Sequence, residues 1–215
     1  MDSGTRDRMA IRRKAVWGSG SRVLAAVFMA SAVSSCGDLT TQGTASSYLI
    51  ITALEAASGA EPNQFDGTLR SDVETVVDDV PSVFNDLGRV RFVLAMKDPG
   101  SPTSPTAPTP ANFITVNRYS VRFVRADGRN APGVDVPYAF DGAFTLTVRD
   151  SETSGVFELV RHLAKLEAPL LALSRNGVII STIAEITFFG RDQTGRDVSV
   201  TGKMLVDFGN FADPD

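Results

Sequence analysis

Apolar and polar residues alternate near the C-terminal end of the chain. Over residues 198–208, apolar side chains occupy one set of positions and polar side chains occupy most positions between them. Side chains of a β-strand point alternately to its two faces, so this pattern predicts a strand with one face on a core and one in water. The predicted core-facing residues are Val198, Val200, Met204, Val206 and Phe208.

The same period of two recurs along most of the chain. Residues 178–190 are apolar on both faces, which predicts a central strand, and a hairpin loop at 191–196 joins them to the last strand. Seven or eight strands with few helices predict an all-β fold, an antiparallel β-sandwich. The other predicted strands lie at 48–56, 68–77 (alternatively a short helix), 90–96, 119–124 and 138–148, where Tyr138, Phe140, Phe144, Leu146 and Val148 share a face.

Two segments complete the predicted domain. Residues 156–170 carry both helical and strand spacing; we favour a strand at about 156–163 followed by a helical turn through Leu173. Residues 98–111 contain five prolines, and proline cannot donate to a strand ladder, which excludes a central strand there. An interdomain linker at this place would leave a marginally small domain before it. We therefore expect a single domain over 47–215 with a Pro-rich loop at 98–111.

The first 35 residues have the pattern of a secretory signal. Six basic residues accompany an apolar run at 23–33 that is too short to span a bilayer. Met9 is an alternative start to Met1. The sequence Val33-Ser34-Ser35-Cys36-Gly37 resembles the lipobox of bacterial lipoproteins. The resemblance implies cleavage before Cys36 and acylation of Cys36, with residues 36–46 as lipidated cysteine and flexible tether. The alternative is an ordinary buried cysteine.

The lipobox resemblance also implies a location in the bacterial envelope. The protein would be membrane-anchored through its acyl chains, and Gly37 after the cysteine favours the outer membrane over the inner. From Cys36 onward the chain keeps 15 of 21 basic and 23 of 25 acidic residues, a net charge of −8. An acidic body of this kind argues against a nucleic-acid partner.

The closing strands resemble an immunoglobulin-like or fibronectin-like module of bacterial surface proteins. The sequence that carries this resemblance is Asp192-Gln193-Thr194-Gly195-Arg196-Asp197-Val198-Ser199-Val200, within a region of about 178–208. It has a polar glycine-containing turn that leads into an alternating strand. The cysteines and core tryptophan of antibody domains are missing from the mature chain, because Cys36 and Trp17 are the only residues of their types.

Catalytic and metal-binding signals are weak. His162, the only histidine, lies between cationic residues, and no Gly-x-Ser-x-Gly elbow accompanies it. Acidic clusters occur at Asp78-Asp79, Asn85-Asp86 and Asp150-Ser151-Glu152. They lack the spacing of a calcium loop, so we read them as solvated turns. We predict no catalytic residues, no metal and no cofactor. The phenylalanines at 140, 144, 188, 208 and 211 are read as core residues. Phe189 is predicted to point away from the face of Phe188, either into the core of the second sheet or toward a partner surface.

The segment 125–135 is the most distinctive loop. It concentrates charged and amide side chains next to predicted strands, and loops on rigid scaffolds often carry recognition. The sequence therefore predicts a non-enzymatic binding or assembly module whose partner is an envelope protein or glycan. The alternative reading of this loop is a long turn whose charged side chains pair with each other and bind no partner. A carboxylate-based glycan-active enzyme and a purely structural lipoprotein are the alternatives for function. The predicted partner-binding residues are Arg125, Asp127, Arg129, Asn130 and Asp135.

Overall fold

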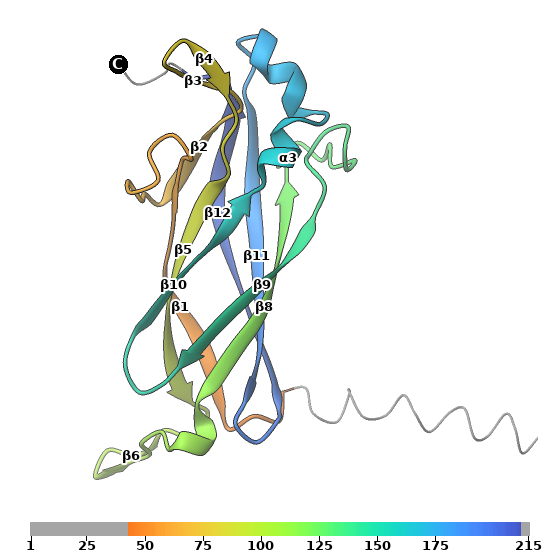
Figure 1. The fold of residues 1–215 in the computed structure, drawn as a ribbon. Helices are drawn as coiled ribbons and strands as arrows, with labels where there is room; N and C mark the ends of the chain where they lie inside the picture. The colour runs from red at the N-terminus through yellow and green to blue at the C-terminus, as the bar shows by residue number, and fades with distance from the viewer. Residues whose placement is uncertain (1–42, 212–215) are drawn as a thin grey trace, which may run out of the picture. The chain divides into compact units, whose positions relative to one another are not determined.

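The computed structural model describes residues 43–211, and the predicted signal segment and Cys36 lie outside these residues. Two β-sheets face each other across one core, so the fold is an all-β sandwich (Figure 1). The smaller sheet has the order β1-β5-β10. Its strands are β1 (Ser47–Ala57), β5 (Asp86–Met96) and β10 (Thr153–Val160), all antiparallel to their neighbours.

The larger sheet has five strands in the order β2-β12-β11-β8-β9. Its pairs are antiparallel except that β2 runs parallel to β12, which departs from the wholly antiparallel arrangement predicted above. The predicted central strand is central, because β11 lies between β12 and β8. The strands are β2 (Thr68–Asp72), β12 (Asp197–Gly209), β11 (Ile180–Asp192), β8 (Ile114–Val124) and β9 (Phe140–Val148).

Short elements occupy the two ends of the sandwich. One end carries the hairpin of β3 (Thr75–Val77) and β4 (Val80–Ser82), the helix α3 (His162–Lys165) and the 3-10 helix η2 (Leu170–Arg175) (Figure 1). The Pro-rich loop lies at the other end. It contains a small hairpin of β6 (Gly100–Ser101) and β7 (Ser104–Pro105) and the 3-10 helix η1 (Pro110–Asn112). The ambiguous segment resolves into β10, then α3 and η2.

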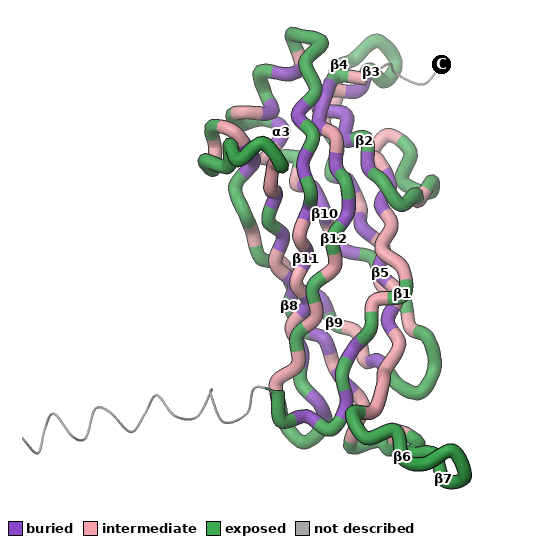
Figure 2. The backbone as a smooth tube through the Cα atoms, turned by 180° about the vertical axis from the view of Figure 1, so that it is seen from behind, coloured by how far each residue is buried: buried purple, intermediate pink, exposed green. Residues whose placement is uncertain are grey.

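The core consists of the residues that the period of two places on the inner faces. Met204, Val206 and Phe208 of β12 are buried, and Val198 and Val200 pack against the core, which confirms the predicted face. Figure 2 shows the alternation of buried and more exposed residues along β8, β11 and β12. In β8 a register shift between Val116 and Arg118 keeps residues on both sides of it facing inward.

Aromatic rings fill the middle of the core. Phe188 of β11 contacts Phe92 of β5 and Phe157 of β10 in edge-to-face geometry, at centroid distances of 5.1 and 5.3 Å. These contacts join the two sheets, because β11 belongs to one and β5 and β10 to the other. Phe189 points away from the face of Phe188 as predicted and does not fill a core, because it is half-buried and the guanidinium carbon of Arg118 lies 4.0 Å from its ring centroid.

Candidate functional site

The predicted binding loop connects β8 to β9 at the end of the sandwich that carries α3 (Figure 1). Its charged side chains converge on one carboxylate. Asp127 pairs with Arg125 at 2.7 Å and with Arg129 at 2.8 Å. These guanidinium groups donate hydrogen bonds to Asp127 and hold the pKa of its carboxyl well below the usual value. The loop therefore has a fixed internal charge arrangement.

Amide and carboxylate groups brace the rest of the loop. Asn130 accepts a 2.7 Å hydrogen bond from the backbone N–H of Arg125, and Asp135 accepts one of 3.1 Å from the N–H of Ala131. All five predicted residues thus lie in one loop, and all five bond within it to each other or to its backbone, as the alternative of a long turn with internally paired charges predicts. Among them, Arg129 keeps a largely exposed side chain, 64% accessible.

Two apolar side chains of the β8–β9 connection are also exposed. Val134 is 70% exposed and Tyr138 is 58% exposed. Gly133 has a φ of +74°, and a Cβ atom there would collide with the Tyr138 ring. Tyr138 therefore lies against the glycine and remains outside β9, so the prediction that it shares the core face of Phe140 is wrong. The φ of Gly133 and its missing Cβ are what allow this arrangement.

A small notch lies between the end of this loop and α3. Its volume is about 180 Å³, and residues 137–140 line one side while Arg161, Leu163, Ala164, Glu167 and Ala168 line the other. Metabolite pockets usually measure about 300 Å³ or more, so this notch is smaller than the usual metabolite site. Sequence reasoning missed it, because α3 is distant from the loop in sequence.

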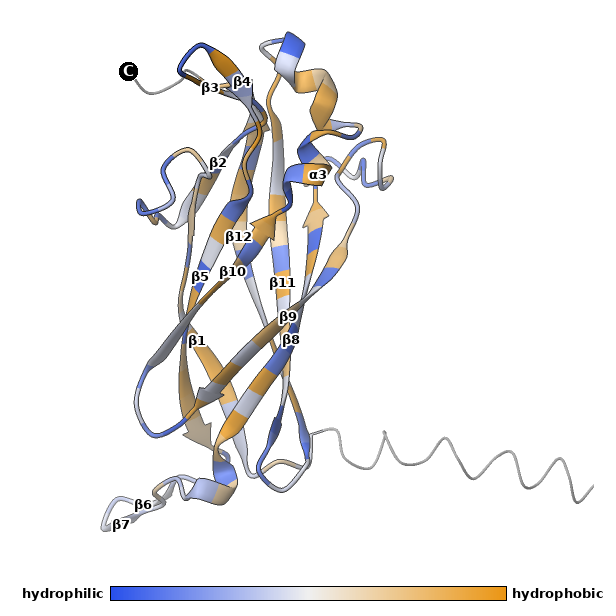
Figure 3. Ribbon diagram, in the orientation of Figure 1, coloured by the Kyte–Doolittle hydropathy of each residue, from blue (hydrophilic) through white to orange (hydrophobic). Residues whose placement is uncertain are grey.

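Arg161, which lines the notch, is held by two contacts. Its guanidinium carbon lies 3.9 Å from the centroid of the Phe140 ring, and Nη2 donates a 2.7 Å hydrogen bond to the carbonyl oxygen of Asp141. Beside it, Leu163 is 56% exposed. Figure 3 shows further hydrophobic residues at this end, in the β3–β4 hairpin and in the segment after α3. We call the surface formed by Val134, Tyr138, Leu163 and the notch the distal surface.

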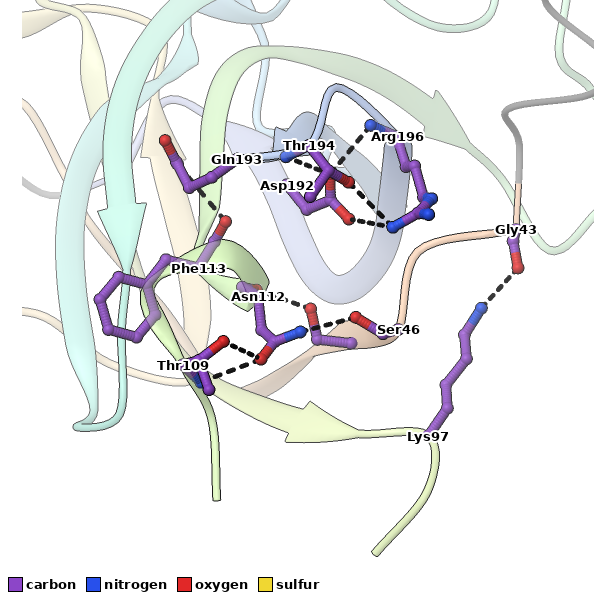
Figure 4. Close-up of polar contacts among 11 residues, drawn as sticks. Gly43, Ser46, Lys97, Thr109, Asn112, Phe113, Asp192, Gln193, Thr194 and Arg196 are labelled. Carbon is purple, nitrogen blue, oxygen red and sulfur yellow. Dashed lines mark hydrogen bonds and ion pairs between the residues drawn. The ribbon is translucent and has the colours of Figure 1, made fainter. Parts of the chain in front are cut away.

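The opposite end fixes the segment that leads toward Cys36 (Figure 4). Lys97, which follows β5, donates two hydrogen bonds to this segment. Its Nζ bonds to the carbonyl oxygen of Gly43, and its backbone N–H bonds to the carbonyl oxygen of Ser46. Asn112 of η1 donates a 2.7 Å hydrogen bond to Ser46 Oγ, and its carbonyl accepts one from Ser47 Oγ. These bonds hold the start of β1 against the Pro-rich loop. We call them the tether clasp.

The β11–β12 turn adjoins the tether clasp. Asp192 Oδ1 accepts three hydrogen bonds, from Thr194 N, Thr194 Oγ1 and Arg196 N, at 2.7–2.9 Å. Burial by itself raises the pKa of Asp192, but these hydrogen bonds outweigh it and lower the pKa below the ordinary value of 3.8. Gln193 reaches across to the carbonyl oxygen of Phe113, as Figure 4 shows.

The remaining candidates have structural partners. His162 Nδ1 lies 2.9 Å from Asn85 Oδ1, which also accepts the backbone N–H of His162. Within residues 43–211, no group of three His, Cys, Asp or Glu side chains is arranged to hold a metal ion. The same part of the chain has no helix long and apolar enough to cross a membrane.

A wider groove of about 520 Å³ lies beside β2. The loop 58–66, residues of β2 and Phe211 form its walls, and the guanidinium of Arg70 lies 4.4 Å from the Phe211 ring. Three carboxylates line it, those of Glu61, Asp66 and Asp72. Asp72 is already bonded, because its oxygens accept from Thr75 Oγ1 and from the N–H of Phe211.

Comparison of the chain with models of protein families gives no match, and comparison with curated proteins finds none that is similar.

Proposed function

We propose that the protein is a lipid-anchored β-sandwich of the bacterial envelope that acts as a non-enzymatic binding or assembly module. The acyl chains on Cys36 anchor it, and the distal surface binds an envelope protein. The observation that carries this proposal is the placement of the tether clasp and the distal surface at opposite ends of the sandwich.

The length of the connection supports an orientation at the membrane. Six residues separate Cys36 from Gly43, and a fully extended chain of six residues reaches about 20 Å. Two or three acyl chains give stable anchoring, whereas one chain alone gives only reversible binding. The tether clasp then holds the end of this segment at the start of β1. The end that holds the clasp therefore lies near the bilayer surface.

The length of the strands supports the exposure of the other end. β11 has 13 residues, and a strand rises about 3.3 Å per residue, so the distal surface stands about 40 Å from the clasp. At that height the loop 125–135 and the notch face away from the lipid. Aromatic, aliphatic and arginine side chains, here Tyr138, Leu163 and Arg129, are suited to a protein contact.

The arrangement of strands supports an immunoglobulin-like or fibronectin-like fold. Two facing sheets of three and five strands with mostly antiparallel pairs are typical of such sandwiches. The parallel pairing of β2 with β12 is a variation at one sheet edge.

Two experiments test the proposal. In cell fractionation, Cys36→Ala is expected to move the protein from the membrane to the soluble periplasm, and unchanged membrane association would refute the anchor. For the surface, a photo-crosslinking residue at 138 or 163 is expected to form one discrete adduct in intact cells. The matched control is position 183, which is an exposed isoleucine on the outer face of the larger sheet. Adducts at neither distal position would contradict binding and favour a purely structural lipoprotein.

A carboxylate-based glycan-active enzyme is the second candidate, and the groove beside β2 is the observation that favours it. Glu61 and Asp66 line a hollow large enough for a sugar ring. Glu61→Gln and Asp66→Asn would then each abolish hydrolysis of purified envelope polysaccharide. If the unaltered protein releases no reducing ends from such glycans, this candidate is eliminated.

A further inference from the structure

A buried lysine and a buried aspartate meet where α3 covers the start of β5, so the reading of 85–86 as a solvated turn is wrong for Asp86. Lys165 Nζ of α3 lies 2.9 Å from Asp86 Oδ1 at the start of β5, and their side chains are 1% and 0% exposed. The two residues are 79 positions apart in sequence. Both side chains are therefore shut off from water, unlike those of the surface ion pairs of this protein.

The surroundings fix the carboxyl group of Asp86. Ser71 Oγ of β2 donates a 2.6 Å hydrogen bond to Oδ2, and the backbone N–H of Gly59 donates one of 2.9 Å to Oδ1. At the surface, Asn85, the residue before β5, accepts a hydrogen bond from the backbone N–H of His162 in α3. β5 and α3 are thus connected twice in succession, which holds the amine against the carboxyl group in one orientation.

Burial disfavours the ionised form of the Asp86 carboxyl group. Removal from water raises the pKa of Asp86, although Lys165 and Ser71 oppose this effect. An ion pair in such a place has lost the hydration of both charges, and the attraction between them does not always compensate for that loss. A neutral amine next to a neutral carboxylic acid is a nucleophile next to an electrophile.

We propose that the side chains of Lys165 and Asp86 condense to an amide bond, which links α3 covalently to β5. A proton first passes from Nζ to Oδ1 along their hydrogen bond. The freed lone pair of Nζ then attacks Cγ, and a C–N bond forms. The C–Oδ1 bond breaks as Oδ1 takes a second proton from Nζ, and Oδ1 leaves as water. An ammonium and a carboxylate are thereby converted to one amide and one water, with no oxidant or reductant.

Ser71 and Gly59 position the reacting carboxyl group. When Nζ attacks Cγ, negative charge develops on Oδ2, and the Ser71 hydroxyl already donates to that atom. Gly59 N–H donates to Oδ1, which is the oxygen that leaves. The bond does not depend on acylation of Cys36 or on a partner, so its test is independent of the proposed function.

Peptide mapping of the full mature chain tests the bond directly. Trypsin cuts after arginine and lysine but not after an acylated lysine. The amide would therefore give one branched peptide, in which residues 71–89 are joined to residues 162–175. Its mass would be the sum of the two peptides less one water. Fragmentation would locate the link between Asp86 and Lys165.

Another ion pair in the same digest is the matched control. Lys203 Nζ lies 2.7 Å from Glu185 Oε1, but the lysine side chain is 62% exposed. We expect the Lys203 and Glu185 peptides to remain unlinked, with cleavage after Lys203. Recovery of residues 162–165 and 166–175 as free peptides, with unlinked 71–89, would overturn the proposal. The result needs no variant, so it does not depend on whether Asp86→Ala folds.

Discussion

The hydroxyl of Tyr119 donates a 3.0 Å hydrogen bond to the carbonyl oxygen of Glu158, and this bond crosses from β8 in the larger sheet to β10 in the smaller. Tyr119 is 3% exposed, and burial raises the pKa of its hydroxyl. The bond therefore joins the sheets at a place where water is largely excluded. Its energetic contribution can be measured with a change of one atom.

Tyr119→Phe is expected to lower the free energy of unfolding by about 1 kcal/mol, because a buried carbonyl loses its partner while the ring stays in place. Urea denaturation followed by circular dichroism measures the change. Tyr138→Phe is the matched control, since Tyr138 is exposed, and it should leave the unfolding midpoint unaltered. Equal midpoints for Tyr119→Phe and the unaltered protein would contradict the role of the inter-sheet bond.

Gly88→Ala is expected to destabilise the domain by about 1–3 kcal/mol, because a methyl group at this position overlaps the Phe157 ring across the β5–β10 pair. Gly67→Ala serves as the control, since a Cβ atom there meets nothing within 4 Å. Thermal unfolding of both variants makes the comparison. Similar melting temperatures for the two variants would show that the Phe157 ring moves aside without cost.

Asp192 predicts a dependence of stability on acid. Its folded-state pKa is lowered from 3.8, so its contribution is present at pH values above the unfolded pKa and is lost as pH falls through the folded pKa. Asp192→Asn keeps an acceptor but cannot ionise. We expect a loss of about 1 kcal/mol at neutral pH that shrinks toward zero in strong acid. Denaturant titrations across this range test it, and a difference that stays constant with pH would contradict it.

Asn112→Ala is expected to loosen the tether clasp, because Ser46 Oγ loses its donor and Thr109 loses its acceptor. Amide hydrogen exchange at Lys97, whose N–H bonds to the Ser46 carbonyl, should become faster by about tenfold if about 1.4 kcal/mol is lost locally. Asn117→Ala, an exposed position in β8, is the control. Unchanged exchange at Lys97 in the Asn112 variant would show that backbone bonds alone hold the segment.

Much of the fold could be predicted because apolar and polar residues must alternate along a strand that has one face on the core and one face in water. Val206 and Phe208 are buried where the period of two places them, and β11 is central as its apolar faces indicate. Tyr138 was placed wrongly, because Gly133 lets it leave the alternation before β9 begins. The parallel β2–β12 pair could not be predicted, since five residues of β2 carry no signal of direction.

The candidate sites were predictable only in part. The loop 125–135 stands out in sequence, but the notch requires α3, and only the fold brings Leu163 beside Tyr138. The sequence around Lys165 does not indicate that this side chain is buried. Lysines are almost always at the surface, and nothing in its neighbourhood in sequence indicates a contact with Asp86.

The direction in which the chain enters β1 determines how the β1–β5 hydrogen bonds respond to a mechanical force on the domain. β1 begins at Ser47, four residues after Gly43, and pairs antiparallel with β5 from Ser47 opposite Met96 to Ala57 opposite Leu87, with one register shift between Ile51 and Ala53. A force applied at Gly43 along the strand axis loads all of these backbone bonds in shear at the same time, whereas peeling would break them singly. Under the proposed function, traction between the anchor and a partner would therefore load the β1–β5 hydrogen bonds together.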